Sequence, residues 1–120
     1  MKILLDNCVH TGAKLLFAGH EVQHVLDLGW EALSNGKLLA AATSAGFQLI
    51  VTVDKNIRFQ QNVLALEVSI LELDLIRTRL KDIQAVTPFL GAAIESAHLF
   101  RFVSLKSDGT IETLAPRSHA

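Results

Sequence analysis

Short apolar runs alternate with amphipathic segments along this chain. Near-continuous apolar runs are typical of strands covered on both faces of a sheet, and the strongest of them reads FQLIVTV at residues 47–53. Val22 and Val25 are the apolar positions of a weaker strand within residues 20–28. The pattern predicts strands at residues 2–5, 20–28, 47–53, 69–73, 100–105 and 111–115.

The segments between these strands have helical spacing. The first, residues 11–19, is expected to begin with Thr11 as N-cap and to turn its apolar side toward the sheet, namely Leu15, Leu16 and Phe17. A second helix over residues 37–46 is capped by Ser34 or Asn35 and closed by Gly46. Its apolar stripe is formed by Leu38, Leu39, Ala42 and Ala45.

The C-terminal third carries two turn signals. Thr87 and Pro88 fit an N-cap and a first helical residue, so residues 77–86 and 88–98 are expected to form two helices or one sharply kinked helix. Asp108–Gly109 predicts a hairpin turn between the last two strands. Residues 116–120 are expected to be a short tail.

Alternation of strands and helices indicates an α/β fold. We expect one domain over residues 1–115, a three-layer α/β/α sandwich around a mainly parallel sheet. Right-handed crossovers favour the strand at residues 2–5 beside the strand at 47–53, with residues 20–28 on its outer side. The chain then reverses direction across the sheet, and ligands in such folds bind at the carboxyl ends of the strands on either side of that reversal.

Composition excludes several classes of protein. The 120 residues include 11 basic and 12 acidic side chains, so a net charge of −1 provides no overall basic field for nucleic acid. Cys8 is the sole cysteine, which rules out a disulfide framework and a four-cysteine zinc site. We find neither a signal-peptide core nor an apolar run long enough for a membrane span, and we expect a cytoplasmic protein.

Two aspartates follow strands that are expected to be neighbours. Asp6 follows residues 2–5, and Asp54 follows residues 47–53. Two carboxylates at one sheet edge repel each other, and a divalent cation relieves that repulsion. Mg²⁺ commonly takes one or two protein carboxylates and keeps several waters. The pair therefore predicts a shared metal site, although an aspartate at a strand end also serves as a simple turn or helix cap.

The same stretches resemble the PIN-like domains, in particular the small stand-alone bacterial type found as toxins in toxin–antitoxin pairs. The resemblance covers residues 1–75 and rests on KILLDNCV, GHEVQHVLDLGW, SNGKLLAAA and VTVDKNIRFQQN in this order. It implies a fold for Mg²⁺- or Mn²⁺-dependent cleavage of RNA, in which acids at strand ends bind the metal and a metal-bound water attacks phosphorus.

The resemblance also implies roles for single residues. Asp6 and Asp54 correspond to family aspartates that ligate metal. Asn35 and Asn56 stand where relatives often carry acids, and each exchange keeps an oxygen ligand but removes a negative charge. Among the neighbouring residues, Lys55 and Arg58 are candidates to balance substrate phosphate, or else belong to an exposed loop.

Other polar residues leave their roles open. Asp27 and Glu31 either reach the site or have surface roles, and Trp30 either stacks on a base or anchors its loop to the core. Cys8 is expected to be a small buried residue. The scattered histidines lack metal-ligand spacing and fit surface or turn positions better, namely His10, His20 and His24.

These observations lead to three hypotheses. The first is a PIN-like ribonuclease toxin that acts on RNA, with a co-encoded antitoxin and a possible homodimer as partners and no membrane association. The second is a catalytically degenerate PIN-like domain that binds RNA or a protein. The third, a receiver-like signalling domain, needs an acidic pair after the first strand, where this chain has Asp6–Asn7.

Overall fold

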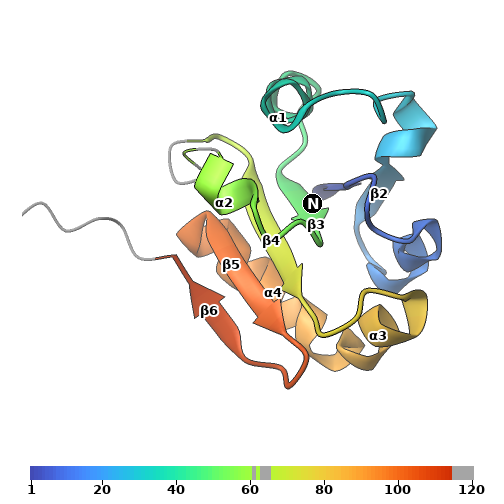
Figure 1. Ribbon diagram of the computed structural model, residues 1–120, viewed down its shortest axis with the longest axis vertical. Coiled ribbons are helices and arrows are strands. Elements are labelled where there is room, and N and C mark those ends of the chain that lie inside the picture. The colour runs from blue at the N-terminus through green and yellow to red at the C-terminus, as the bar shows by residue number, and fades with distance from the viewer. Residues whose placement is uncertain (61, 63–65, 115–120) are drawn as a thin grey trace, which may run out of the picture.

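A computed structural model describes residues 1–60, 62 and 66–114 of the chain (Figure 1). These residues form a six-stranded sheet in the order β2-β1-β3-β4-β5-β6. The first five strands are parallel to their neighbours, and β6 is antiparallel to β5. The strands are β1 Lys2–Leu5, β2 Glu21–His24, β3 Leu49–Thr52, β4 Ser69–Asp74, β5 Phe102–Lys106 and β6 Ile111–Thr113.

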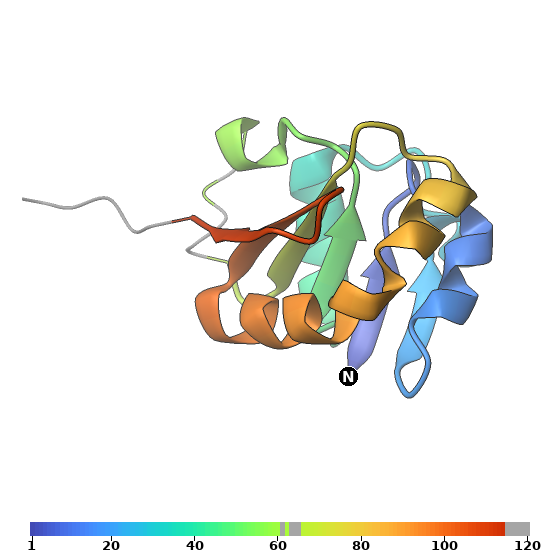
Figure 2. The same ribbon diagram turned by 90° about the horizontal axis from the view of Figure 1, so that it is seen from below.

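Helices cover both faces of this sheet. The α-helices are α1 Asn35–Ser44, α2 Ile57–Gln60, α3 Leu80–Ala85 and α4 Thr87–Phe100, and two short 3₁₀ helices are η1 Thr11–Leu16 and η2 Val25–Leu28. Figure 2 shows α3 and α4 (gold to orange) beside each other against the sheet. The predicted fold class, an α/β domain with a mainly parallel sheet, is confirmed, as is the position of β1 between β2 and β3. The tail at residues 116–120 lies outside the described residues.

Two apolar clusters fill the space on either side of the sheet. Alternate residues of a strand point to opposite faces, so Ile3 and Leu5 join one cluster while Leu4 joins the other. The first cluster packs under η1, α3 and α4, and the second packs under α1 and includes Ile57 of α2. The three layers therefore follow from the near-continuous apolar runs of the central strands.

The segment after β1 differs from its prediction. It forms the 3₁₀ helix η1, and its N-cap is His10, whose Nδ1 accepts a hydrogen bond of 3.0 Å from the N–H of Gly12. Leu15 is 87% exposed, so of the three residues predicted to face the sheet Phe17 does so and Leu16 does so in part. The tighter 3₁₀ winding, with three residues per turn, rotates Leu15 away from the sheet.

The expected strand at residues 20–28 is shorter than predicted. β2 ends at His24, and the next four residues form η2 because His24 and Asp27 close a capping box. The Asp27 carboxylate accepts a 2.8 Å hydrogen bond from the N–H of His24, and His24 Nδ1 accepts one from the N–H of Leu26. Local side-chain bonds to the backbone thus end the strand early.

Both C-terminal turn signals are largely confirmed. Two helices, α3 and α4, meet near Pro88, although Thr87 lies inside α4 and Val86 takes the N-cap position. The hairpin turn contains Gly109 with φ +89°. A Cβ atom there would lie 2.8 Å from the Phe89 ring, so a side chain would both strain the left-handed backbone and displace that ring.

In α1 the predicted stripe is correct except at its end. Leu38, Leu39 and Ala42 are buried, whereas Ala45 is exposed because it caps the helix. Within the described residues, we find no helix of the length and apolar character that crossing a membrane requires.

Candidate acidic site at the carboxyl edge of the sheet

Asp6 continues the β1–β3 pairing by one residue. Its N–H donates to the carbonyl of Val51 over 2.9 Å, which confirms that it follows a strand adjacent to β3. The side chain is only 8% exposed. Oδ1 accepts a 2.8 Å hydrogen bond from the N–H of Asn7, and Oδ2 accepts one of 2.8 Å from the Thr52 hydroxyl. The carboxylate is therefore buried and already hydrogen-bonded at both oxygens.

Asp54 lies two residues beyond the end of β3. Its Oδ1 accepts a 2.9 Å hydrogen bond from the N–H of Asn56, which closes a tight turn. Its N–H donates to Thr52 Oγ1 over 3.0 Å. Because the same hydroxyl donates to Asp6, Thr52 links the two aspartates that the sequence predicted to be neighbours.

Asn35 reaches this edge from the start of α1. Its Nδ2 donates to Asp54 Oδ2 over 3.3 Å. The preceding residue, Ser34, occupies the N-cap position but makes no side-chain capping bond. A helix that follows a parallel strand starts at the carboxyl edge of the sheet, which explains why the first residue of α1 meets the end of β3. Asp54 thus contacts both predicted amide residues, Asn35 through its side chain and Asn56 through its backbone.

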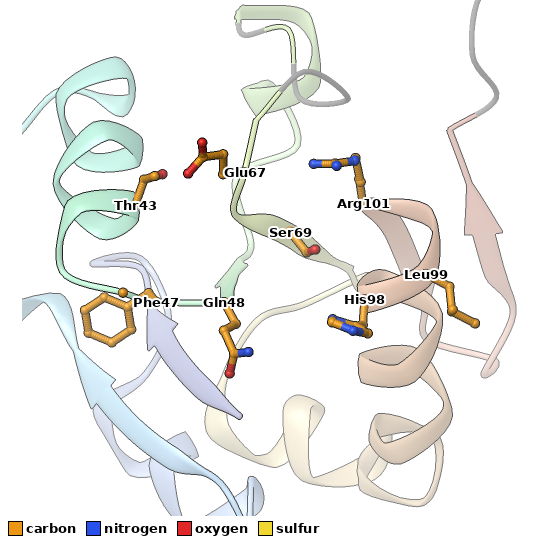
Figure 3. A pocket seen from close by; sticks show the side chains of 9 residues that line it. Thr43, Phe47, Gln48, Glu67, Ser69, His98, Leu99 and Arg101 are labelled. Atoms are coloured by element: carbon orange, nitrogen blue, oxygen red, sulfur yellow. The ribbon is translucent and has the colours of Figure 1, made fainter.

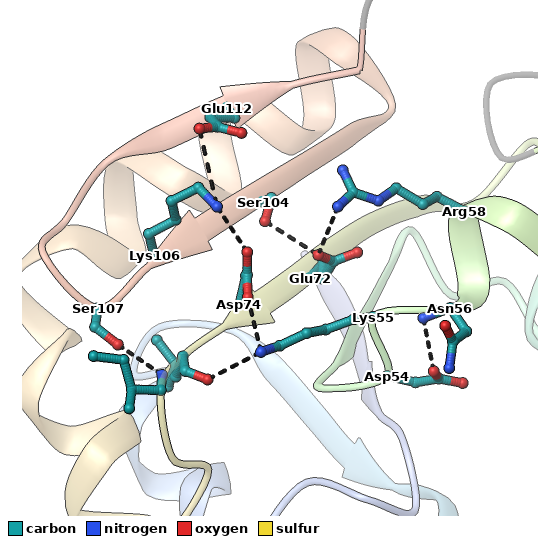
Figure 4. A network of polar contacts seen from close by, with 12 residues as sticks. Asp54, Lys55, Asn56, Arg58, Glu72, Asp74, Ser104, Lys106, Ser107 and Glu112 are labelled. Atoms are coloured by element: carbon teal, nitrogen blue, oxygen red, sulfur yellow. Dashed lines mark hydrogen bonds and ion pairs between the residues drawn. The ribbon is translucent and has the colours of Figure 1, made fainter.

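Lys55 and Arg58 turn toward acidic residues of β4 (Figure 4). Lys55 Nζ lies 3.0 Å from Asp74 Oδ1 and also donates to the carbonyl of Leu75 over 3.3 Å. Arg58 lies 3.9 Å from Glu72 Oε1. The two predicted phosphate-binding side chains are therefore engaged in ion pairs, with Lys55 half exposed and Arg58 28% exposed.

The sequence analysis did not predict a row of buried polar side chains that crosses β3, β4 and β5. Thr52, Glu72 and Ser104 occupy matching positions of β3, β4 and β5, and all three are buried. They replace the apolar residues that fill the same face closer to the amino edge, such as Ile50 and Ile70. The available signal was a glutamate inside the otherwise apolar run SILEL.

Glu72 is the most unusual member of this row. It is fully buried, and its Oε1 accepts a 3.2 Å hydrogen bond from the Ser104 hydroxyl. Within the part of the chain that the structure describes, Glu72 Oε2 and Arg58 Nε have no hydrogen-bond partner. Burial raises the pKa of the Glu72 carboxyl, and the nearby Arg58 guanidinium offsets part of that rise. Glu72 is therefore a buried acid with one carboxylate oxygen that lacks a hydrogen bond among the described residues.

Asp74, two residues further along β4, has the opposite environment. Lys106 donates to its Oδ2 over 2.7 Å, and Lys55 pairs with its Oδ1. The hydrogen bonds from Lys106 and Lys55 hold the pKa of the Asp74 carboxyl below its usual value. A hollow of about 350 Å³ lies beside these three residues and Ser107.

Cys8 lies next to Asp6 and is exposed, so the expectation of a buried cysteine is wrong. Its sulfur nevertheless faces inward and lies 3.5 Å from both Asp6 Oδ2 and Thr52 Oγ1. Partial burial of the thiol and the negative charge of Asp6 raise the Cys8 pKa. The protonated thiol is a weak donor to Asp6 and a poor nucleophile.

The other polar and aromatic residues that the sequence left open have structural roles. Trp30 packs edge-on against Phe47, with ring centroids 6.2 Å apart, and borders the second apolar cluster. Asp27 pairs with Lys14 at 2.8 Å, and both side chains are more than a third exposed. His24 is buried, with Nε2 2.7 Å from the carbonyl of Val9. None of these contacts reaches Asp6 or Asp54.

A second hollow opens at the opposite, amino edge of the sheet (Figure 3). It has a volume of about 450 Å³ and lies where β3, β4 and β5 begin. Arg101, His98 and Glu67 line it, so a cation, an imidazole and a carboxylate meet there without a dominant charge. Arg101 has φ 68° and donates to the carbonyl of Leu66, which ties the end of α4 to the segment before β4.

The donor set at the carboxyl edge sets limits on a metal site. Over residues 1–60, 62 and 66–114, no three or more His, Cys, Asp or Glu side chains are grouped so as to hold a metal ion. A cation here would take the carboxylates of Asp6 and Asp54 together with amide oxygens, water or substrate oxygens. Mg²⁺ suits such a set, because it keeps several waters when only one or two carboxylates bind it.

No protein-family model, no curated protein and no solved structure matches this chain.

Proposed function

We propose that this chain is a PIN-like, Mg²⁺- or Mn²⁺-dependent ribonuclease and the toxin of a toxin–antitoxin pair. The observation that carries the proposal lies where β1 and β3 end: the Thr52 hydroxyl contacts the Asp6 carboxylate and the Asp54 backbone N–H, and Asn35 contacts the Asp54 carboxylate. This is also where ligands bind in parallel α/β sheets. The resemblance of residues 1–75 to PIN-like domains supports the same assignment.

In this proposal Asp6 and Asp54 hold the cation, and the amide oxygens of Asn35 and Asn56 complete the polar surroundings. A bound Mg²⁺ supplies an activated water and neutralises charge on the phosphate. The protein contributes position: the Thr52 hydroxyl fixes the Asp6 carboxylate, and the turn closed by Asn56 fixes Asp54. To accept a cation, Asp6 exchanges one of its present hydrogen bonds for a metal contact.

Substrate phosphate is assigned to Lys55 and Arg58. Lys55 is half exposed, so a phosphate can approach its ammonium while Asp74 still holds the other side. The Arg58 side chain is 28% exposed and lies 3.9 Å from Glu72, and this long ion pair leaves guanidinium N–H groups to donate to a phosphate oxygen. A co-encoded antitoxin and a homodimer are parts of the same proposal.

A specific observation favours the second candidate, a non-catalytic module that binds RNA or a protein. Both oxygens of Asp6 already accept hydrogen bonds, and the residue is 8% exposed. A carboxylate that is satisfied in this way binds a cation more weakly than an open one. With amides at positions 35 and 56, the site then carries too little charge for catalysis.

Cleavage of labelled RNA by the purified protein separates the two candidates. The ribonuclease cuts only when Mg²⁺ or Mn²⁺ is present, and Asp6→Asn, which keeps an acceptor for Thr52, reduces cutting at least a hundredfold. Glu95→Gln, an exposed acid on the opposite face in α4, serves as the matched control and keeps full activity. RNA binding without cutting in either metal supports the module and contradicts the ribonuclease.

A further inference from the structure

Phe59 presents an aromatic ring to solvent at the edge of the acidic site. The side chain is 78% exposed, more than any other aromatic residue in the described part of the chain. Its neighbour Ile57 is 1% exposed and belongs to the second apolar cluster. The short helix α2 is therefore anchored by Ile57, and the outward direction of Phe59 follows from that anchoring.

Arg58 lies beside this ring. The central carbon of its guanidinium is 5.2 Å from the centroid of Phe59, within the range of a cation–π contact. Glu72 holds the inner side of Arg58, and the side chain stays 28% exposed. An exposed aromatic face and a cation consequently lie together on one turn of helix.

Two hydrogen bonds through the backbone of Asn56 connect α2 to the Asp54 carboxylate. The N–H of Asn56 donates to Asp54 Oδ1 over 2.9 Å, and the N–H of Phe59 donates to the carbonyl of Asn56 over 2.9 Å. The ring therefore has a defined position relative to the candidate metal ligand and does not belong to a separate loop.

We propose that Phe59 stacks on an unpaired base of single-stranded RNA while Arg58 contacts the adjoining phosphate. This inference rests on the proposed function and specifies its substrate as single-stranded. Aromatic rings next to cations are typical of single-strand binding, since every base offers a π face and every nucleotide a phosphate. A duplex keeps its bases stacked inside and offers no face to Phe59.

The position favours RNA over a protein partner because of charge. Lys55 and Arg58 follow Asp54 in the chain, and although Asp74 and Glu72 pair with them, both side chains stay partly exposed and can donate to a phosphate oxygen. Trp30, the aromatic residue that the sequence suggested for stacking, is packed against Phe47 instead. Phe59 takes that role in the structure.

Binding to a fluorescently labelled single-stranded oligoribonucleotide in EDTA, where no cutting occurs, tests the inference. Phe59→Ala weakens binding about tenfold to a hundredfold, in line with the loss of one stacked base. Phe100→Ala, which removes another exposed ring at the end of α4, leaves affinity unchanged. Binding to a duplex of the same length does not change with Phe59→Ala, and the melting temperature stays the same because the ring is exposed.

The variant Phe59→Trp reports base stacking directly through its tryptophan fluorescence. Stacking on a base quenches the new indole, and the wild-type protein, which contains only Trp30, supplies the baseline. If the wild type binds single-stranded RNA and Phe59→Ala binds it equally well, the stacking inference is wrong and the proposed function stands. If the wild type binds no single-stranded RNA in EDTA, the stacking inference is wrong, and the cleavage assay in Mg²⁺ or Mn²⁺ decides the proposed function separately. A Phe59→Ala variant that loses only self-association identifies the ring as a protein contact and also overturns the inference.

Discussion

Asp6 and Asp54 are joined through one hydroxyl group, that of Thr52. The hydroxyl donates to Asp6 Oδ2 over 2.8 Å and accepts from the N–H of Asp54 over 3.0 Å. Thr52 is fully buried, so neither contact exchanges freely with water. The orientation of the Asp6 carboxylate and the position of the Asp54 backbone therefore depend on a side chain that is not itself a metal-ligand candidate.

Replacing Thr52 by valine, which has a similar shape but no hydroxyl, should lower the free energy of unfolding by about 1–3 kcal/mol. The loss arises because Asp6 Oδ2 loses its shortest hydrogen bond and the Asp54 N–H loses its acceptor. Urea denaturation of the metal-free protein measures it. Thr52→Ser keeps the hydroxyl and should retain most of the stability; a smaller loss for Thr52→Val than for Thr52→Ser would mean that methyl packing, and not the hydrogen bonds, stabilises this position.

Asp54→Asn should change the stability of the metal-free protein by less than about 1 kcal/mol. The amide retains an oxygen for the N–H of Asn56, and the Asn35 amide can turn to present its own oxygen. Asp54→Ala removes both contacts and should cost about 1 kcal/mol. Thermal unfolding of the two variants gives the comparison. A loss above about 2 kcal/mol for Asp54→Asn would identify the charge itself as structural.

Asn35→Asp should create a metal-dependent stability. It places two carboxylates together where Asn35 Nδ2 now lies 3.3 Å from Asp54 Oδ2. Repulsion between them, reduced by the helix N-terminus, should cost about 1 kcal/mol without metal. Added Mn²⁺ or Mg²⁺ should restore that loss in a thermal-shift measurement, because the cation binds between the acids. Asn35→Ala, the control, should show no response to metal beyond that of the wild type.

The double change Asn35→Asp with Asn56→Asp extends this test to catalysis. If the amides are lost acids, the added charge holds metal more tightly, and RNA cleavage should rise about tenfold or more. The rate of RNA cleavage at saturating Mn²⁺ is the relevant measurement. Tighter metal binding with no cleavage in either protein would favour the binding module.

Glu72 should make the protein less stable as pH rises above the ordinary range of a glutamate. The unfolded chain ionises Glu72 at its usual pKa, whereas burial raises the pKa in the folded chain. Between these two values the folded state binds more protons than the unfolded state, so the free energy of unfolding falls with increasing pH. Glu72→Gln should remove this decline. Urea denaturation at a series of pH values measures it, with exposed Glu95→Gln as the control.

Asp74 should produce the opposite trend at lower pH. Its pKa is lowered in the folded state by Lys106 and Lys55, so the stability it contributes is present above the usual aspartate pKa and is lost as pH falls through the lowered value. Asp74→Asn should therefore destabilise the protein at neutral pH and reduce its sensitivity to acid. An unchanged acid profile would mean that the two lysines bind other groups in solution.

The sequence alone determined the approximate strand positions, the placement of β1 between β2 and β3, and the positions of the first acids. The apolar runs LIVT and KILL are buried as β3 and β1, and Asp6 and Asp54 follow them at one edge of the sheet. These features are local: they depend on side-chain periodicity, on turn residues such as Gly109, and on the handedness of the crossovers. The strands, turns and acids can each be read within a window of a few residues, whereas the placement of the strands follows from the crossover rule.

Only the tertiary structure decided how the polar side chains pair. Glu72 meets Ser104 because β4 and β5 align in one register, and residues more than thirty positions apart face each other as a result. The same alignment draws Lys55 to Asp74 and turns Arg58 inward. A shift of one residue would reverse the face of every side chain in a strand. Register arises from packing of the whole sheet, which no local pattern in the sequence records.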